Sequence, residues 1–136
     1  MNPTEEYIEL NSLKHYLYIY GKDPVKPTLL FLHGGPGSTS SPIGYNLQAW
    51  AKRCNLVFYD QRGTARTRFA NPRAIAALED VLNDWDCTVE YITARFGGAP
   101  ILLGHSWGHC PGNALCAGAA RKSPQSHLCG IRRRSG

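Results

Sequence analysis

An apolar run leads directly into a glycine-flanked serine in the stretch Ile101-Leu102-Leu103-Gly104-His105-Ser106-Trp107-Gly108-His109. The G-x-S-x-G pattern after a predicted strand is typical of a nucleophile elbow, a sharp strand-to-helix turn with the serine at its tip. Gly104 and Gly108 suit such a turn because a Cβ at either position would collide with neighbouring backbone. An ordinary Gly/Ser turn after a strand is the alternative interpretation.

A second glycine-rich motif, His33-Gly34-Gly35-Pro36-Gly37, follows another apolar run upstream. Residues 28–33 are continuously apolar up to His33, which predicts a strand buried on both faces. A glycine-rich turn after such a strand presents backbone N–H groups to a cleft. Preorganised N–H donors of this kind are what an oxyanion hole requires. A plain loop is the alternative.

The other sequence patterns alternate strands with helices. Two strands over 5–10 and 15–20 flank a turn at Asn11-Ser12, which predicts an antiparallel hairpin. Apolar spacing predicts a helix over 43–54 and a longer helix over 78–96 that ends at Gly97-Gly98. With strands at 28–33, 56–59 and from 101, the order predicts an α/β fold: a hairpin leading into a mostly parallel sheet flanked by helices.

The motif Asp60-Gln61-Arg62-Gly63 follows the predicted strand over 56–59. Asp60 and Arg62 carry groups that could take part in catalysis. We interpret them instead as a structural pair that shapes the loop beside the site.

The net charge of +5 has an uneven origin along the chain. Ten Lys or Arg balance ten Asp or Glu before Ser106, and the entire excess lies after it. A basic tail can bind nucleic acid, but no aromatic stacking platform or known binding motif accompanies this one. We therefore expect no nucleic-acid partner.

The N-terminus and the cysteines exclude other classes of protein. Residues 1–6 are polar and acidic, unlike a signal peptide, and no apolar run approaches the length of a membrane span. The five cysteines form no C-x-x-C pair, so a zinc site is not expected. We predict a soluble, cytoplasmic protein with no membrane association, no metal ion and no cofactor.

The three motifs, in this order and spacing, resemble the proline iminopeptidase branch of the α/β-hydrolases over about residues 5–108. The resemblance implies that Ser106 is the nucleophile and that the backbone amides of Gly35 and Trp107 form the oxyanion hole. It implies supporting roles for His33, Gly34, Gly37, Asp60, Arg62, Gly104, His105 and Gly108. Members of this branch release an N-terminal residue, often proline, and close relatives hydrolyse esters, amides or carbon–carbon bonds. The substrate expected from the resemblance is therefore a small peptide, ester or amide, and Ala65 stands where a glycine is usual.

The sequence departs from the family's pattern after Ser106. The family needs an acid and then a histidine beyond the nucleophile, but no Asp or Glu follows Ser106. His109 and His127 do follow it, and neither stands at the end of a later predicted strand. We expect residues 1–108 to form a partial hydrolase core, residues 109–136 to form a divergent basic tail that is disordered or out of frame, and the chain to be an inactive, truncated form.

The tail also fails as a helix, because Pro111, Gly112 and Gly118 interrupt it. In another reading frame the code from Cys110 onward permits Val-Leu-Gly-Thr-Leu-Tyr-Ala-Gln-Glu, which suits a helix after the elbow. We hypothesise a reading-frame shift near His109; a natural short variant with a divergent tail is the alternative.

The functional alternatives to a serine hydrolase are a non-catalytic fragment or interaction module and, third, a nucleic-acid binder. Substrate identity and oligomeric state are left open.

Overall fold

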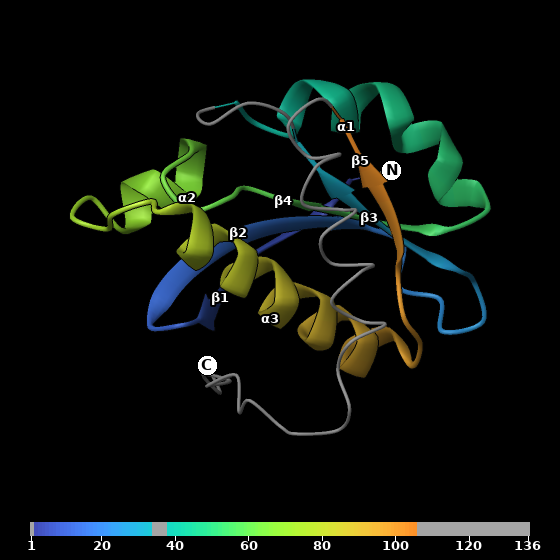
Figure 1. Cartoon of the computed structure of the whole chain (residues 1–136). Coiled ribbons are helices and arrows are strands. Elements are labelled where there is room, and N and C mark those ends of the chain that lie inside the picture. Colours follow the sequence, from blue (N-terminus) through green and yellow to red (C-terminus); the bar gives the residue numbers. More distant parts are fainter. Residues whose placement is uncertain (1, 34–37, 106–136) are drawn as a thin grey trace.

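A mixed sheet of five strands forms the centre of the molecule, with helices on both faces (Figure 1). The computed structural model describes residues 2–33 and 38–105. The strands are β1 (Thr4–Leu10), β2 (Leu13–Tyr20), β3 (Thr28–Leu32), β4 (Asn55–Tyr59) and β5 (Ile101–Gly104). The helices are α1 (Ser41–Leu47), the 3-10 helix η1 (Gln48–Lys52), α2 (Ala65–Ala70) and α3 (Leu78–Phe96).

The strand order is β1-β2-β4-β3-β5. β2 is antiparallel to both β1 and β4, whereas β3 is parallel to both β4 and β5. The parallel part of the described sheet thus consists of β4, β3 and β5. The predicted α/β class is confirmed, with the hairpin leading into the parallel strands.

The hairpin between β1 and β2 turns at Asn11 and Ser12. Their φ angles are 49° and 63°, so both residues adopt the positive φ that a two-residue type I′ turn requires. Asparagine tolerates this region better than most residues do. The predicted hairpin and its turn residues are therefore confirmed.

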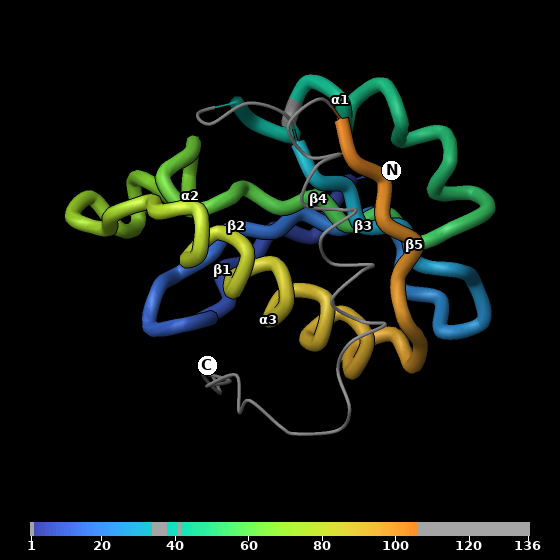
Figure 2. The backbone as a smooth tube through the Cα atoms, in the orientation of Figure 1, coloured from blue at the N-terminus to red at the C-terminus, as the bar shows by residue number. Residues whose placement is uncertain are grey.

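The two faces of the sheet are covered by different helices, as the backbone tube shows (Figure 2). Alternate residues of a strand point to opposite faces, and β2 divides its side chains accordingly. Leu17 and Ile19 pack in the cluster that includes Trp85 of α3. Tyr16, Tyr18, Tyr20, Phe31, Phe58 and Leu56 form the cluster on the other face, with Ile43 and Leu47 of α1 packed against it.

Helix α3 is the 19-residue helix predicted from its apolar spacing. Glu79 and Asp80 lie in its first turn, where negative charge interacts favourably with the helix dipole. Gly97 ends it with φ 79° and donates its N–H to the Thr93 carbonyl. This left-handed conformation is why a glycine follows the helix.

The segment predicted as one helix over 43–54 divides into α1 and η1. Gly44 lies so close to the sheet that a Cβ added there would collide with the ring and hydroxyl of Tyr18. The sequence did not predict α2, whose six residues are too few to show a helical period. No helix in residues 2–33 and 38–105 is long and apolar enough to cross a membrane.

Candidate active site

Three parallel strands end side by side at one edge of the sheet. In the register, Leu32 of β3 lies opposite Tyr59 of β4 and Gly104 of β5. The His105 N–H donates to the Leu32 carbonyl at 3.1 Å, which extends the pairing one residue past β5. The residues that follow each strand therefore leave the sheet at the same edge, where ligand sites of open α/β sheets lie.

The three sequence motifs begin at this edge. His33 follows β3, Asp60 follows β4, and Gly104 is the last residue of β5. The remaining predicted site residues, Gly34, Gly35, Gly37, Ser106, Trp107 and Gly108, lie outside the described residues, as does the tail over 109–136. Their roles, and the boundary predicted near residue 108, remain predictions.

His33 is completely buried and bonded to the loop after β4. The Gln61 N–H donates to His33 Nε2 at 3.1 Å, and the Gln61 side-chain amide donates to the His33 carbonyl at 3.0 Å. The Thr64 hydroxyl donates to the Gln61 carbonyl at 2.7 Å. All three residues are at most 3% exposed. Because Nε2 accepts a hydrogen bond, the neutral ring carries its proton on Nδ1.

His105 differs from His33 in its surroundings, although both directly follow a parallel strand. The His105 side chain is exposed, whereas the His33 side chain is buried. His105 is fixed by its main chain, through the bond to Leu32. Among the described residues, the His33 side chain is thus buried and hydrogen-bonded, and the His105 side chain is exposed to solvent.

Asp60 is also buried, with 1% exposure. Its carboxylate accepts from the Thr39 hydroxyl at 3.1 Å and from the Arg66 N–H at 3.3 Å. Its carbonyl accepts from the Thr67 hydroxyl at 2.6 Å, and its N–H donates to the Tyr16 carbonyl. Asp60 thus holds together the segment after the glycine motif, helix α2 and strand β2.

Arg62 does not pair with Asp60, which corrects the expectation that these two residues form a structural pair. Its Nε and Nη2 donate to the two carboxylate oxygens of Asp84 in α3, at 2.7 and 2.9 Å. This hydrogen bonding raises the pKa of the Arg62 guanidinium. Asn11 of the hairpin turn adds a further donor to Asp84 at 2.9 Å. Arg62 thus ties the loop after β4 to α3 through Asp84.

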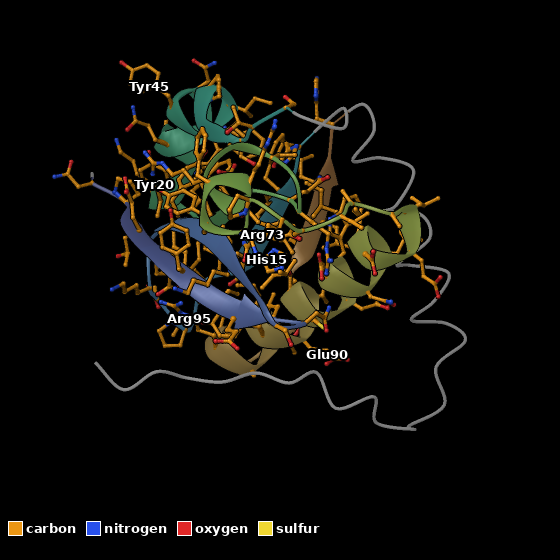
Figure 3. The ribbon with its side chains drawn as sticks, turned by 90° about the vertical axis from the view of Figure 1, so that its left-hand side faces the viewer. His15, Tyr20, Tyr45, Arg73, Glu90 and Arg95 are labelled. Carbon is orange, nitrogen blue, oxygen red and sulfur yellow. The ribbon has the colours of Figure 1, made fainter. Side chains whose placement is uncertain are left out.

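His15 is completely buried inside the molecule (Figure 3), close to Asp84. Its Nε2 is 3.6 Å from Asp84, and within the described part of the chain neither ring nitrogen has a hydrogen-bond partner. Burial lowers the pKa of His15 to about 4, although the nearby Asp84 carboxylate raises it. The ring is therefore neutral near neutral pH.

Sequence reasoning missed Asp84, Gln61, Thr64 and Thr39. One signal for Asp84 was available, because an acid stands beside Trp85 in the apolar stripe of a helix, where a buried charge needs a partner. Ala65, noted where a glycine is usual, has φ 39°, in the region that glycine adopts more easily. Residues 2–33 and 38–105 contain no group of three or more His, Cys, Asp or Glu that could hold a metal ion.

Comparison with known proteins gives consistent matches. The family model described as alpha/beta hydrolase fold matches residues 27–124. The proline iminopeptidase of Lactobacillus delbrueckii subsp. lactis is 31% identical over 110 residues, which cover 79% of this chain and 37% of that protein. The probable aminopeptidase YbaC of Bacillus subtilis (strain 168) is 31% identical over 107 residues, which cover 74% of this chain and 33% of that protein.

Solved structures share the fold. A proline iminopeptidase-related protein from Thermus thermophilus superposes with a TM-score of 0.69 at 22% identity, covering 86% of this chain and 41% of the other. An epoxide hydrolase from Vigna radiata gives a TM-score of 0.67 at 21% identity, covering 89% and 37%. The chain thus spans between 33% and 41% of the length of these four proteins.

Proposed function

Because the chain belongs to the α/β-hydrolase fold family, we propose that it derives from a serine hydrolase of the aminopeptidase type. One observation carries this proposal. β3 and β5 are parallel neighbours with Leu32 opposite Gly104, so the glycine motif and the serine motif start from adjacent strands. Nucleophile and oxyanion donors need this proximity.

The proposed chemistry is acyl transfer through an acyl-enzyme. The Ser106 oxygen attacks the carbonyl carbon of an amide or ester, and the backbone amides of Gly35 and Trp107 stabilise the oxyanion. The bond to the amine or alcohol breaks, and the leaving group takes up the proton that the Ser106 hydroxyl gives up. Water then attacks the acyl-enzyme, releases the acid and restores the serine hydroxyl. The names of two relatives, a proline iminopeptidase and a probable aminopeptidase, favour peptides with a free N-terminal residue as substrates.

The sequence from Ser106 to Gly136 contains no Asp or Glu, so this polypeptide offers no acid there to orient a histidine base. Loss of members of such a triad typically costs several orders of magnitude in rate. We expect the 136-residue protein to react slowly at Ser106 and to show little turnover.

The test uses a fluorophosphonate probe and a proline arylamide on the purified 136-residue protein. We expect slow covalent labelling that peptide mass spectrometry places on Ser106 and that Ser106→Ala abolishes. Labelling at another residue, or none at all, would contradict the serine nucleophile. Rapid arylamide hydrolysis that Ser106→Ala abolishes would contradict the expected inactivity instead.

A second candidate, association through the sheet edge, is favoured by β5. In the described sheet β5 pairs with β3 alone, and Ile101 is 57% exposed. Unpaired strand edges act as templates for pairing with other chains. Sedimentation velocity tests this candidate: a protein that stays monomeric at all concentrations would exclude it.

A further inference from the structure

The loop after β4 holds the chain on the N-terminal side of the glycine motif. Gln61 makes two hydrogen bonds to His33, one from its N–H to the ring and one from its side-chain amide to the carbonyl. Thr64 in turn fixes the Gln61 carbonyl, which accepts from both the hydroxyl and the N–H of Thr64. His33 immediately precedes Gly34, so these bonds fix the position from which the motif starts.

The same stretch of chain also holds the C-terminal side of the motif. The Thr39 hydroxyl donates to the Asp60 carboxylate at 3.1 Å. The adjacent Ser40 hydroxyl donates to the Tyr59 carbonyl at 3.1 Å, inside the protein. Both ends of the span between His33 and Thr39 are therefore bonded to residues 59–61.

We propose that Asp60 and Gln61 are positioning residues that hold the oxyanion-hole segment at its two ends. The inference rests on the proposed function, because this segment matters to catalysis only if it binds an oxyanion. Displacing reacting groups by about 1 Å can cost about 100-fold in rate. Anchors at both ends limit such displacement.

The hydrogen bonds from Gln61 to His33, together with the bond from Thr64 to Gln61, form a clamp on His33. This clamp also determines the role of the His33 ring. The Nε2 lone pair of His33 accepts a hydrogen bond from the Gln61 N–H. The Thr64 hydroxyl lies 3.4 Å from Nε2 but donates its hydrogen to the Gln61 carbonyl. With this acceptor occupied in a completely buried ring, His33 acts as an anchor rather than as the base that deprotonates Ser106.

The first experiment compares substitutions at the two anchors with a matched control. Gln61→Met keeps the length of the side chain but removes the side-chain amide that donates to the His33 carbonyl. Thr39→Val removes the hydroxyl that donates to the Asp60 carboxylate. Both variants should slow phosphonate labelling of Ser106 by at least about tenfold, with Gln48→Met on η1 as the control that leaves it unchanged. Wild-type labelling rates in both anchor variants would overturn the proposal.

The second experiment separates an anchor from a base at His33. A glutamine side-chain oxygen can take the place of Nε2 as acceptor, whereas leucine leaves the buried Gln61 N–H without one. We expect His33→Gln to label within about threefold of wild type and His33→Leu to label at least about tenfold more slowly. Equal loss in the two variants would overturn the anchor role.

Two further measurements test the clamp even if the phosphonate probe does not react with Ser106. Nitrogen NMR of histidine-labelled protein, with the His33 signals identified by their absence in His33→Gln, should show the Nδ1-protonated tautomer. His33→Leu should also melt at a lower temperature than His33→Gln. An Nε2-protonated His33 ring or equal melting temperatures of the two variants would overturn the clamp itself. If both results are as expected but the phosphonate probe does not label wild-type Ser106, only the proposed function is overturned.

Discussion

Asp84 and Asp60 are both buried, and the loop after β4 connects their surroundings, but different groups stabilise the two carboxylates. Asp84 of α3 is completely buried and binds the Arg62 guanidinium through both oxygens. The carboxylate of Asp60, almost as buried, accepts within the described part of the chain from the Thr39 hydroxyl and the Arg66 N–H. The first carboxylate faces a full positive charge, and the second faces neutral donors.

The contrast separates stability from the geometry of the candidate site. The Asp84 region joins the hairpin turn, the loop after β4 and helix α3, and it lies on the α3 face of the sheet. The Asp60 region joins the segments at the carboxyl ends of β3 and β4. Arg62 and Gln61 are adjacent in sequence, yet they bond to different regions, so substitutions can disturb one region without the other.

Removing the charge of Asp84 should give the largest loss. Asp84→Asn keeps the shape of the side chain but removes the carboxylate charge that binds the Arg62 guanidinium, which should cost about 3–5 kcal/mol of unfolding free energy. Urea denaturation at neutral pH measures this loss. Glu90→Gln, the same exchange at an exposed position of α3, should change stability by less than about 0.5 kcal/mol. A loss below about 1 kcal/mol in Asp84→Asn would show that the buried pair is dispensable.

Acid should act on the same region through His15. The native ring accepts a proton only near pH 4, whereas the unfolded chain does so near 6.5. As the pH falls from 7 towards 4, the unfolded state therefore binds a proton that the native state refuses, and stability falls by up to about 3 kcal/mol.

The matched variant for the acid effect is His15→Phe, which cannot titrate. Since neither His15 nitrogen has a hydrogen-bond partner among the described residues and the ring is neutral at pH 7, an apolar ring should cost little at neutral pH. Unfolding free energies measured across this pH range should fall less steeply in the variant than in wild type. Identical slopes would rule out His15 as the source.

The smallest of the three effects should come from the Asp60 region. The Thr67 hydroxyl donates to the Asp60 carbonyl and accepts from the Tyr16 N–H at 2.9 Å, inside the protein. Thr67→Val should cost about 2 kcal/mol, because buried backbone groups lose their partner. Thr93→Val removes only a bond within α3 and should cost less than about 0.5 kcal/mol. Equal unfolding midpoints for the two variants would contradict the prediction.

The sequence predicted those parts of the fold whose signals are local. The strand over 15–20, the turn at Asn11-Ser12 and the stop at Gly97 each depend on neighbouring residues, and each is confirmed. The pairing of Arg62 with Asp84 spans 22 residues, and motif spacing suggested the nearer Asp60 instead. The clamp at His33 was not predicted because it depends on β3 and β4 being neighbours, which no local pattern encodes.

The Asn11 side chain donates to Asp84 across 73 residues, and this separation bears on how the chain assembles. During synthesis the hairpin emerges first, but β2 gains its second neighbour only with β4, and the turn is secured only when α3 docks. Contacts this far apart in sequence slow folding. Until β4 pairs with it, the free edge of β2 can pair with other nascent chains, so the delay before β4 docks sets the interval in which this polypeptide is most prone to aggregate.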